Sequence, residues 1–140
     1  MPRIGLVWAG NPGHDNDRWR SMPKAALLRL ATARPDLEWV NLQFGDPDGP
    51  HFADFAATAQ AIAGLDLLVT VDTAAAHVAG TLGVPVWLML AAEPDWRWGA
   101  TGETTPWYAS ARLFRQNRLG DWEPVIRAVE AALPPAERGE

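Results

Sequence analysis

The sequence predicts an α/β protein, a Rossmann-like three-layer α/β/α fold with a parallel sheet of about five strands. Short apolar segments of strand length alternate along the chain with longer segments of helical periodicity. Their order, β-α-β-α-β-α-β-loop-β-α, favours a parallel sheet with helices on both faces. The apolar run at residues 67–71, LLVTV, is short and unbroken, as expected for a strand buried on both faces.

The composition indicates one globular domain. The chain has 140 residues, which is long enough for a single hydrophobic core. Of these residues, 48% are hydrophobic and 21% are charged, as is ordinary for a globular protein. We expect the domain to span residues 1–133 and residues 134–140 to form a frayed tail. Because Met1 and Pro2 lead almost directly into the first strand, we expect the chain to be one domain of a longer protein.

Several classes of function are disfavoured by the same composition. The chain has no cysteine, which excludes disulfides and thiolate metal sites. Its net charge of −5 argues against nonspecific nucleic-acid binding. No apolar run approaches the length of a transmembrane segment and no signal peptide is visible, so we expect no membrane span and a cytoplasmic location.

The first strand, residues 3–9, is followed by a long polar loop at residues 10–22, GNPGHDNDRWRSM. The loop lacks the spacing of a dinucleotide fingerprint and the Gly-Lys-Ser/Thr of a P-loop. Its two arginines, its asparagines and its glycine N–H groups suit a phosphate. These candidates are Gly10, Asn11, Asn16, Arg18 and Arg20. The alternative is a solvated loop in which the arginines pair with Asp15 and Asp17.

The next elements follow from local signals. A helix is predicted at residues 24–34, after Pro23 and before Pro35. A strand at residues 38–42 leads into Gln43 and Phe44, where a ribose or base would be read at the sheet edge; the alternative is a simple turn amide. A helix of small residues follows at residues 55–63.

The central stretch, residues 66–80, contains the most informative motif. The strand at residues 67–71 meets Asp72 and Thr73, which are good N-cap residues, and then an alanine-rich helix that ends at Gly83. His77 lies one turn after Thr73 on the same helix face. A helix start at the carboxyl end of a strand offers free N–H groups to an anion. The alternative is that Asp72 and Thr73 only cap the helix and that the alanines only pack.

The last third of the chain contains two further strands and a helix. A strand at residues 84–90 precedes a long segment whose Trp96 and Trp98 would either contact a base or sugar or only plug the sheet edge. A strand at residues 112–115 and a helix at residues 122–133, capped by Asp121, complete the chain. If the first and third strands are neighbours, their following loops flank the topological switch point, where ligands bind.

The stretch VDTAAAHVAGTLGVPVW resembles the sugar-nucleotide motif of double-Rossmann (GT-B) glycosyltransferases. It is similar in particular to the lipopolysaccharide heptosyltransferase family, whose pattern is Asp-Thr-small-x-x-His followed by Gly-x-Pro. Residues 7–23 and 95–116 resemble a bacterial group in which such a domain follows tetratricopeptide repeats. The resemblance covers residues 4 to about 129 and implies a carboxyl-terminal, donor-binding domain.

The resemblance implies roles for individual residues. Asp72 matches the acidic residue near the donor sugar, and Arg20 stands where heptosyltransferases carry a phosphate-binding lysine. Gln43 stands near the place of an acidic residue that reads the ribose, so the identity of the nucleotide is open. The helix start that holds the diphosphate is matched by Thr73, Ala74, Ala75 and His77.

The sequence therefore predicts the nucleotide-sugar-binding domain of a hexosyl- or heptosyltransferase-like enzyme, active only with a missing amino-terminal domain. The ligand is a nucleoside-diphosphate sugar, and no metal or other cofactor is expected. The alternative is a non-catalytic nucleotide- or protein-binding module derived from the same fold. The predicted diphosphate contacts are Gly10, Asn11, Asn16, Arg18, Arg20, Thr73, Ala74, Ala75 and His77, and the predicted base, ribose or sugar contacts are Gln43, Phe44, Trp96 and Trp98.

Overall fold

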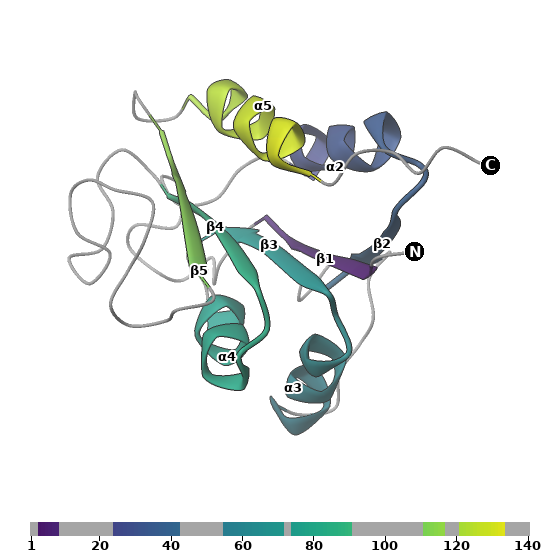
Figure 1. Cartoon of the computed structure of the whole chain (residues 1–140), viewed down its shortest axis with the longest axis vertical. Helices are drawn as coiled ribbons and strands as arrows, with labels where there is room; N and C mark the ends of the chain where they lie inside the picture. Colours follow the sequence, from purple (N-terminus) through teal and green to yellow (C-terminus); the bar gives the residue numbers. More distant parts are fainter. Residues whose placement is uncertain are drawn as a thin grey trace.

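The computed structural model describes residues 3–8, 24–42, 55–71, 74–90, 111–116 and 121–133. Within these residues, five parallel strands form one sheet in the order β2-β1-β3-β4-β5 (Figure 1). The elements are β1 (Arg3–Val7), α2 (Lys24–Ala33), β2 (Glu38–Asn41), α3 (Phe55–Ala63), β3 (Leu67–Val71), α4 (Ala74–Leu82), β4 (Val86–Leu90), β5 (Ala111–Arg115) and α5 (Glu123–Ala132). The predicted fold class and the parallel sheet are confirmed.

Helices cover both faces of the sheet, so the domain has three layers. Helices α2 and α5 lie side by side on one face, and α3 and α4 lie side by side on the other (Figure 1). Each face has its own apolar cluster, which we call the α2/α5 cluster and the α3/α4 cluster. The sheet separates the two clusters, and its central strand contributes to both.

Strand β3 lies in the middle of this arrangement, and all five of its residues are buried. Leu67, Val69 and Val71 point into the α2/α5 cluster, whereas Leu68 points into the α3/α4 cluster. A strand with apolar surroundings on both faces has no polar alternation, which is why its sequence reads as an unbroken apolar run. The predicted bounds of this strand agree with the structure.

Strand β1, next to β3, contains a glycine because three leucines approach its backbone closely. A Cβ atom on Gly5 would lie 2.6 Å from Leu65 Cδ1, 2.9 Å from Leu42 Cδ1 and 3.1 Å from Leu68 Cδ1. These distances are shorter than ordinary carbon–carbon contacts. Gly5 therefore lets the α3/α4 cluster reach the backbone of β1.

Helix α4 ends in a Schellman motif centred on Gly83, whose φ is 75°. The N–H of Gly83 donates to the carbonyl of Gly80 at 3.2 Å, and the N–H of Val84 donates to that of Ala79 at 2.9 Å. These bonds satisfy two carbonyl groups of the last turn, and the left-handed conformation suits glycine. The predicted helix end at Gly83 is confirmed, and β4 begins at Val86, two residues later than the sequence predicted.

The predicted cap of the last helix is wrong. Trp122, not Asp121, occupies the N-cap position of α5, and its side chain makes no capping hydrogen bond. Trp122 is instead buried in the α2/α5 cluster. Pro124 in the first turn has no N–H to satisfy, so the need for a capping acceptor is smaller. Burial of the indole therefore decides where this helix begins.

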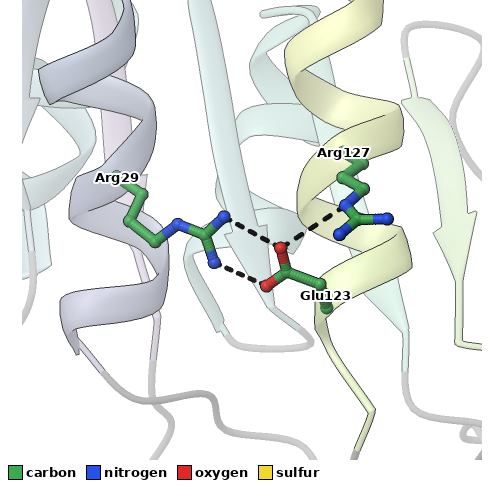
Figure 2. A network of polar contacts seen from close by, with 3 residues as sticks. All are labelled: Arg29, Glu123 and Arg127. Atoms are coloured by element: carbon green, nitrogen blue, oxygen red, sulfur yellow. Dashed lines mark hydrogen bonds and ion pairs between the residues drawn. The ribbon is translucent and has the colours of Figure 1, made fainter.

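An ion-pair network joins α2 to α5 on the outside of their layer (Figure 2). Arg29 donates to both carboxylate oxygens of Glu123, at 2.5 and 2.8 Å. Arg127, one turn further along α5, lies 3.4 Å from the same carboxylate. The hydrogen bond from Arg29 is the largest influence on Glu123 and holds its pKa below the ordinary value. Desolvation opposes this effect, and the charges of Arg29 and Arg127 add to the lowering.

Among the described residues, no helix is both long and apolar enough to span a membrane.

Candidate functional site: the carboxyl edge of the sheet

The strand register brings the carboxyl ends of all five strands to one edge of the sheet. In β1, Leu6 pairs with Asn41 of β2 and Val7 pairs with Thr70 of β3. Thr70 in turn pairs with Leu88 of β4, and Leu90 pairs with Arg115 of β5. The connections that follow the strands therefore leave from this carboxyl edge, where α/β proteins bind ligands.

The topological switch point lies between β1 and β3. These two strands are neighbours, which is the condition for a switch point between the first and third strands. The chain continues from β1 to α2 on one face and from β3 to α4 on the other (Figure 1). Because the connections diverge to opposite faces, the carboxyl ends of β1 and β3 form a switch point of the kind at which α/β proteins bind nucleotides.

Helix α4 begins at this switch point. Only two residues, Asp72 and Thr73, separate the last residue of β3 from Ala74, the first residue of α4. The amino end of α4 thus lies at the carboxyl edge, where its first N–H groups lack acceptors within the helix. Together with the helix dipole, these groups favour an anion.

The first two turns of α4 combine tight packing with one titratable side chain. Ala76 and Ala79 are buried against the sheet in the α3/α4 cluster, and Ala75 is half-buried beside it. Small side chains here allow the helix to approach the sheet closely. His77, in the first turn, is half-buried, so the predicted imidazole lies near the amino end of the helix and not in the core.

The described residues include three of the predicted contact residues, Ala74, Ala75 and His77, and all three belong to the start of α4. The other predicted site residues lie outside the described residues, and their roles stay predictions. They are Gly10, Asn11, Asn16, Arg18, Arg20, Gln43, Phe44, Asp72, Thr73, Trp96 and Trp98.

Two polar residues at the edge were not singled out from the sequence. Arg115, the last residue of β5, is half-buried, and burial lowers the pKa of its guanidinium from the ordinary value. Gln116 follows it and is 5% exposed, and its N–H donates to the carbonyl of Leu90 at 2.9 Å. The sequence did show a cationic residue at the end of a predicted strand, but the parallel direction of β5 was needed to place that residue at the carboxyl edge.

A third such residue is Thr70, which the sequence analysis treated only as part of an apolar run. Thr70 is fully buried, and its hydroxyl donates to the carbonyl oxygen of Val71 at 2.8 Å. Thr70 and Gln116 are the buried polar residues of the described part of the chain. Both lie within two residues of the carboxyl end of a strand, so the polar groups of the interior gather at this edge.

Among the described residues, no three His, Asp or Glu side chains lie close enough together to hold a metal ion.

Comparison with known proteins supports the fold. No protein-family model matches the sequence. The structure is similar to that of E. coli ADP-heptose lipopolysaccharide heptosyltransferase II, with a TM-score of 0.55 and 21% sequence identity over 93% of this chain and 45% of that chain. The chain thus shares a Rossmann-like α/β fold with part of that enzyme, and the resemblance predicted from the sequence is confirmed at the level of the fold.

A curated relative is similar in sequence. The chain is 29% identical over 151 residues to Protein FlbA of Caulobacter vibrioides, and the match covers 94% of this chain and 25% of that protein. The chain therefore spans about a quarter of the length of this relative and less than half of the heptosyltransferase.

Proposed function

We propose that this domain binds the nucleotide-sugar donor of a glycosyltransferase. The observation that carries the proposal is the position of α4, whose amino end follows β3 by two residues at the switch point of the sheet. That geometry suits a diphosphate. The motif from Asp72 to His77, which joins β3 to α4, and the fold shared with a heptosyltransferase support it.

In this proposal the site acts by electrostatics without a metal ion. Asp72 orients the donor sugar, and the helix start with Arg18, Arg20 and His77 neutralises the diphosphate leaving group. Fixed charges and N–H dipoles stabilise a leaving group best when they already point to where its charge develops. Base, ribose and sugar contacts are assigned to Gln43, Phe44, Trp96 and Trp98.

Titration calorimetry with ADP, UDP and GDP tests the proposal. We expect weak binding with a preference for one nucleotide, and we expect Arg20→Ala to abolish it. Arg3→Ala is the matched control, because Arg3 begins β1 at the opposite edge of the sheet and its side chain forms an exposed ion pair with Glu38 at 2.9 Å. No binding at millimolar concentration would contradict the proposal and favour a non-catalytic, protein-binding module.

The role of His77 is tested by pH. If the His77 imidazolium contacts phosphate, its positive charge is lost when it deprotonates as pH rises. Nucleotide affinity should therefore weaken between about pH 6 and 7.5. In His77→Gln that dependence should flatten. A variant with the same pH profile as the wild type would leave His77 a packing residue at the helix start.

We further propose that residues 1–133 form one half of a two-domain enzyme. Glycosyl transfer needs a donor site, an acceptor site and usually a base for the acceptor proton, held together away from water. This chain matches 45% of the length of the heptosyltransferase, which supports the proposal that it is one half of a two-domain enzyme. The tetratricopeptide partner and the cytoplasmic location stay predictions.

The isolated chain should therefore bind donor without sustained turnover. Diphosphate release from candidate sugar nucleotides measures this directly. Robust release that Asp72→Asn abolishes would place a complete active site within these 140 residues and would refute the half-enzyme.

A further inference from the structure

Arg115 lies at the carboxyl end of β5, the last strand in the order of the sheet. Leu113 and Ala111, two and four residues earlier in the strand, both belong to the α3/α4 cluster. The register of β5 with β4 is unbroken from Ala111 to Arg115, so successive side chains alternate regularly between the two faces. Arg115 is therefore on the face of the sheet that α3 and α4 cover.

The register also gives the level of Arg115 along the sheet. Met89 of β4 pairs both with Val71, the last residue of β3, and with Phe114 of β5. Arg115 is thus one residue beyond the level of Val71, where β3 ends and the chain turns into α4. Helix α4 packs against β3 and β4, and two strand spacings, about 10 Å, separate β3 from β5. Arg115 and the amino end of α4 therefore share one face and one edge of the sheet.

The surroundings of Arg115 differ from those of two other arginines. Arg29 and Arg34 are hydrogen-bonded to carboxylates, which raise the pKa of both guanidinium groups. The pKa of Arg115 is lowered instead, because burial removes part of its hydration. A guanidinium is weakly hydrated compared with an ammonium group, so it tolerates this loss and suits a partly buried anion. An anionic group that binds beside it would also be less screened than in open water.

The order of the strands indicates which part of a donor would reach Arg115. In the proposed function, the diphosphate lies at the switch point between β1 and β3. The predicted base and ribose contacts, Gln43 and Phe44, follow β2, on the far side of β1. A donor with its nucleoside toward β2 directs its sugar the other way along the edge, toward β4 and β5. Arg115 is thus on the side of the sugar.

We propose that Arg115 binds a carboxylate on the donor sugar, so that the ligand is the nucleotide derivative of an acidic sugar. This inference rests on the proposed function and adds to it the class of sugar. A carboxylate matches the paired N–H donors of a guanidinium. An uncharged sugar would gain less, because hydrogen bonds between neutral groups are about half as strong as those with an ionised partner.

Two sugar nucleotides that differ only in the acid test the inference. UDP-glucose and UDP-glucuronic acid have the same nucleotide and ring, and the CH2OH group of one is a carboxylate in the other. The corresponding ADP or GDP pair is used if the wild type prefers that nucleotide. In titration calorimetry the acid form should bind the wild type about tenfold or more tightly than the alcohol form. In Arg115→Gln the two forms should bind within about twofold of each other.

Two further variants control for charge and for position. Arg115→Lys keeps the positive charge but loses the paired donors, so its preference for the acid form should be intermediate. Arg112→Gln is the matched control, because Arg112 is an exposed arginine of the same strand on the opposite face, with its guanidinium carbon 4.8 Å from the centre of the Phe114 ring. It should keep the wild-type preference. Urea unfolding verifies that each variant is folded; if Arg115→Gln is not, the wild type and Arg115→Lys still give the comparison.

Each outcome separates the inference from the proposed function. A wild type that binds UDP but prefers the acid form no more than the alcohol form would overturn the inference and leave the proposed function standing. An equal loss of affinity for UDP and for both sugar nucleotides in Arg115→Gln would also overturn it, because Arg115 would then act on the diphosphate. If the wild type binds no nucleoside diphosphate or sugar nucleotide at millimolar concentration, the proposed function is wrong and the inference falls with it.

Discussion

Replacing Gly5 with alanine should destabilise the domain although the change is the smallest possible in side-chain size. The new methyl group would lie 2.6 Å from Leu65 Cδ1 and 2.9 Å from Leu42 Cδ1, and both leucines are 7% exposed. A third leucine, Leu68, lies 3.1 Å away and is fully buried. The clashing atoms are side-chain ends, but three packed leucines cannot all move aside without disturbing the α3/α4 cluster.

The expected magnitude is the balance of two effects. Overpacking of a buried site costs about 1 to 3 kcal/mol. The alanine also restricts the unfolded chain, which offsets about 0.4 to 1 kcal/mol of that cost. We therefore expect a net loss of about 1 to 2 kcal/mol. With a typical urea m-value of about 2 kcal/mol per molar, the unfolding midpoint should fall by about 0.5 to 1 M.

Urea unfolding followed by tryptophan fluorescence measures this shift. Gly64→Ala is the control, since its Cβ would have no neighbour closer than 3.5 Å; this variant should be neutral or stabilised by up to about 1 kcal/mol. In a Leu65→Val background, which removes the closest atom, the cost of Gly5→Ala should shrink by about 0.5 kcal/mol or more. A Gly5→Ala variant as stable as Gly64→Ala, or an equal cost in both backgrounds, would refute the steric argument.

Two further predictions concern the end of α4 and the α2–α5 network. Gly83→Ala should lower the free energy of unfolding by about 1 to 2 kcal/mol, because residue 83 has a positive φ, although a Cβ there would meet nothing within 4 Å. Gly83→Asn should cost less. An alanine variant as stable as the wild type in urea would contradict the argument from backbone strain. For Glu123, the folded pKa lies below the ordinary 4.5, so its contribution is present above that pH and is lost as pH falls through the folded pKa. Glu123→Gln should remove the loss of stability that protonation of Glu123 causes at acid pH, as measured by the unfolding midpoint at several pH values. If the variant's midpoint has the same pH dependence as the wild type, the ion pair with Arg29 contributes nothing to stability.

Where the sequence predicted the structure well, one local signal was sufficient. The bounds of β3 follow from an apolar run, and the end of α4 follows from Gly83 and Pro85. Where prediction failed, a distant contact decided the outcome. Asp121 is a good capping residue, but the burial of Trp122 against the α2/α5 cluster sets the start of α5.

For the candidate site too, local sequence signals predicted some residues correctly, and residues placed by distant contacts were missed. The motif at residues 72–77 identified the right strand end and helix start, because both lie close together in the sequence. Arg115 was missed because its place at the carboxyl edge depends on β5 running parallel to β4, which the long segment between the two strands left open in the sequence. The buried polar group of Thr70 was missed because a threonine in a strand fits the same apolar, β-branched pattern as a valine.

The order of the strands also has a consequence for folding. Strand β1 lies between β2 and β3, and its pairing with β3 joins residues as far apart as Ile4 and Leu67. Strand β3 pairs on its other side with β4, from Leu68 to Val86, across the short helix α4. Closing the smaller loop costs less chain entropy, so the β3–α4–β4 unit can form before β1 docks. On a ribosome, β1 emerges first and must wait with one edge open until most of the sheet has been synthesised.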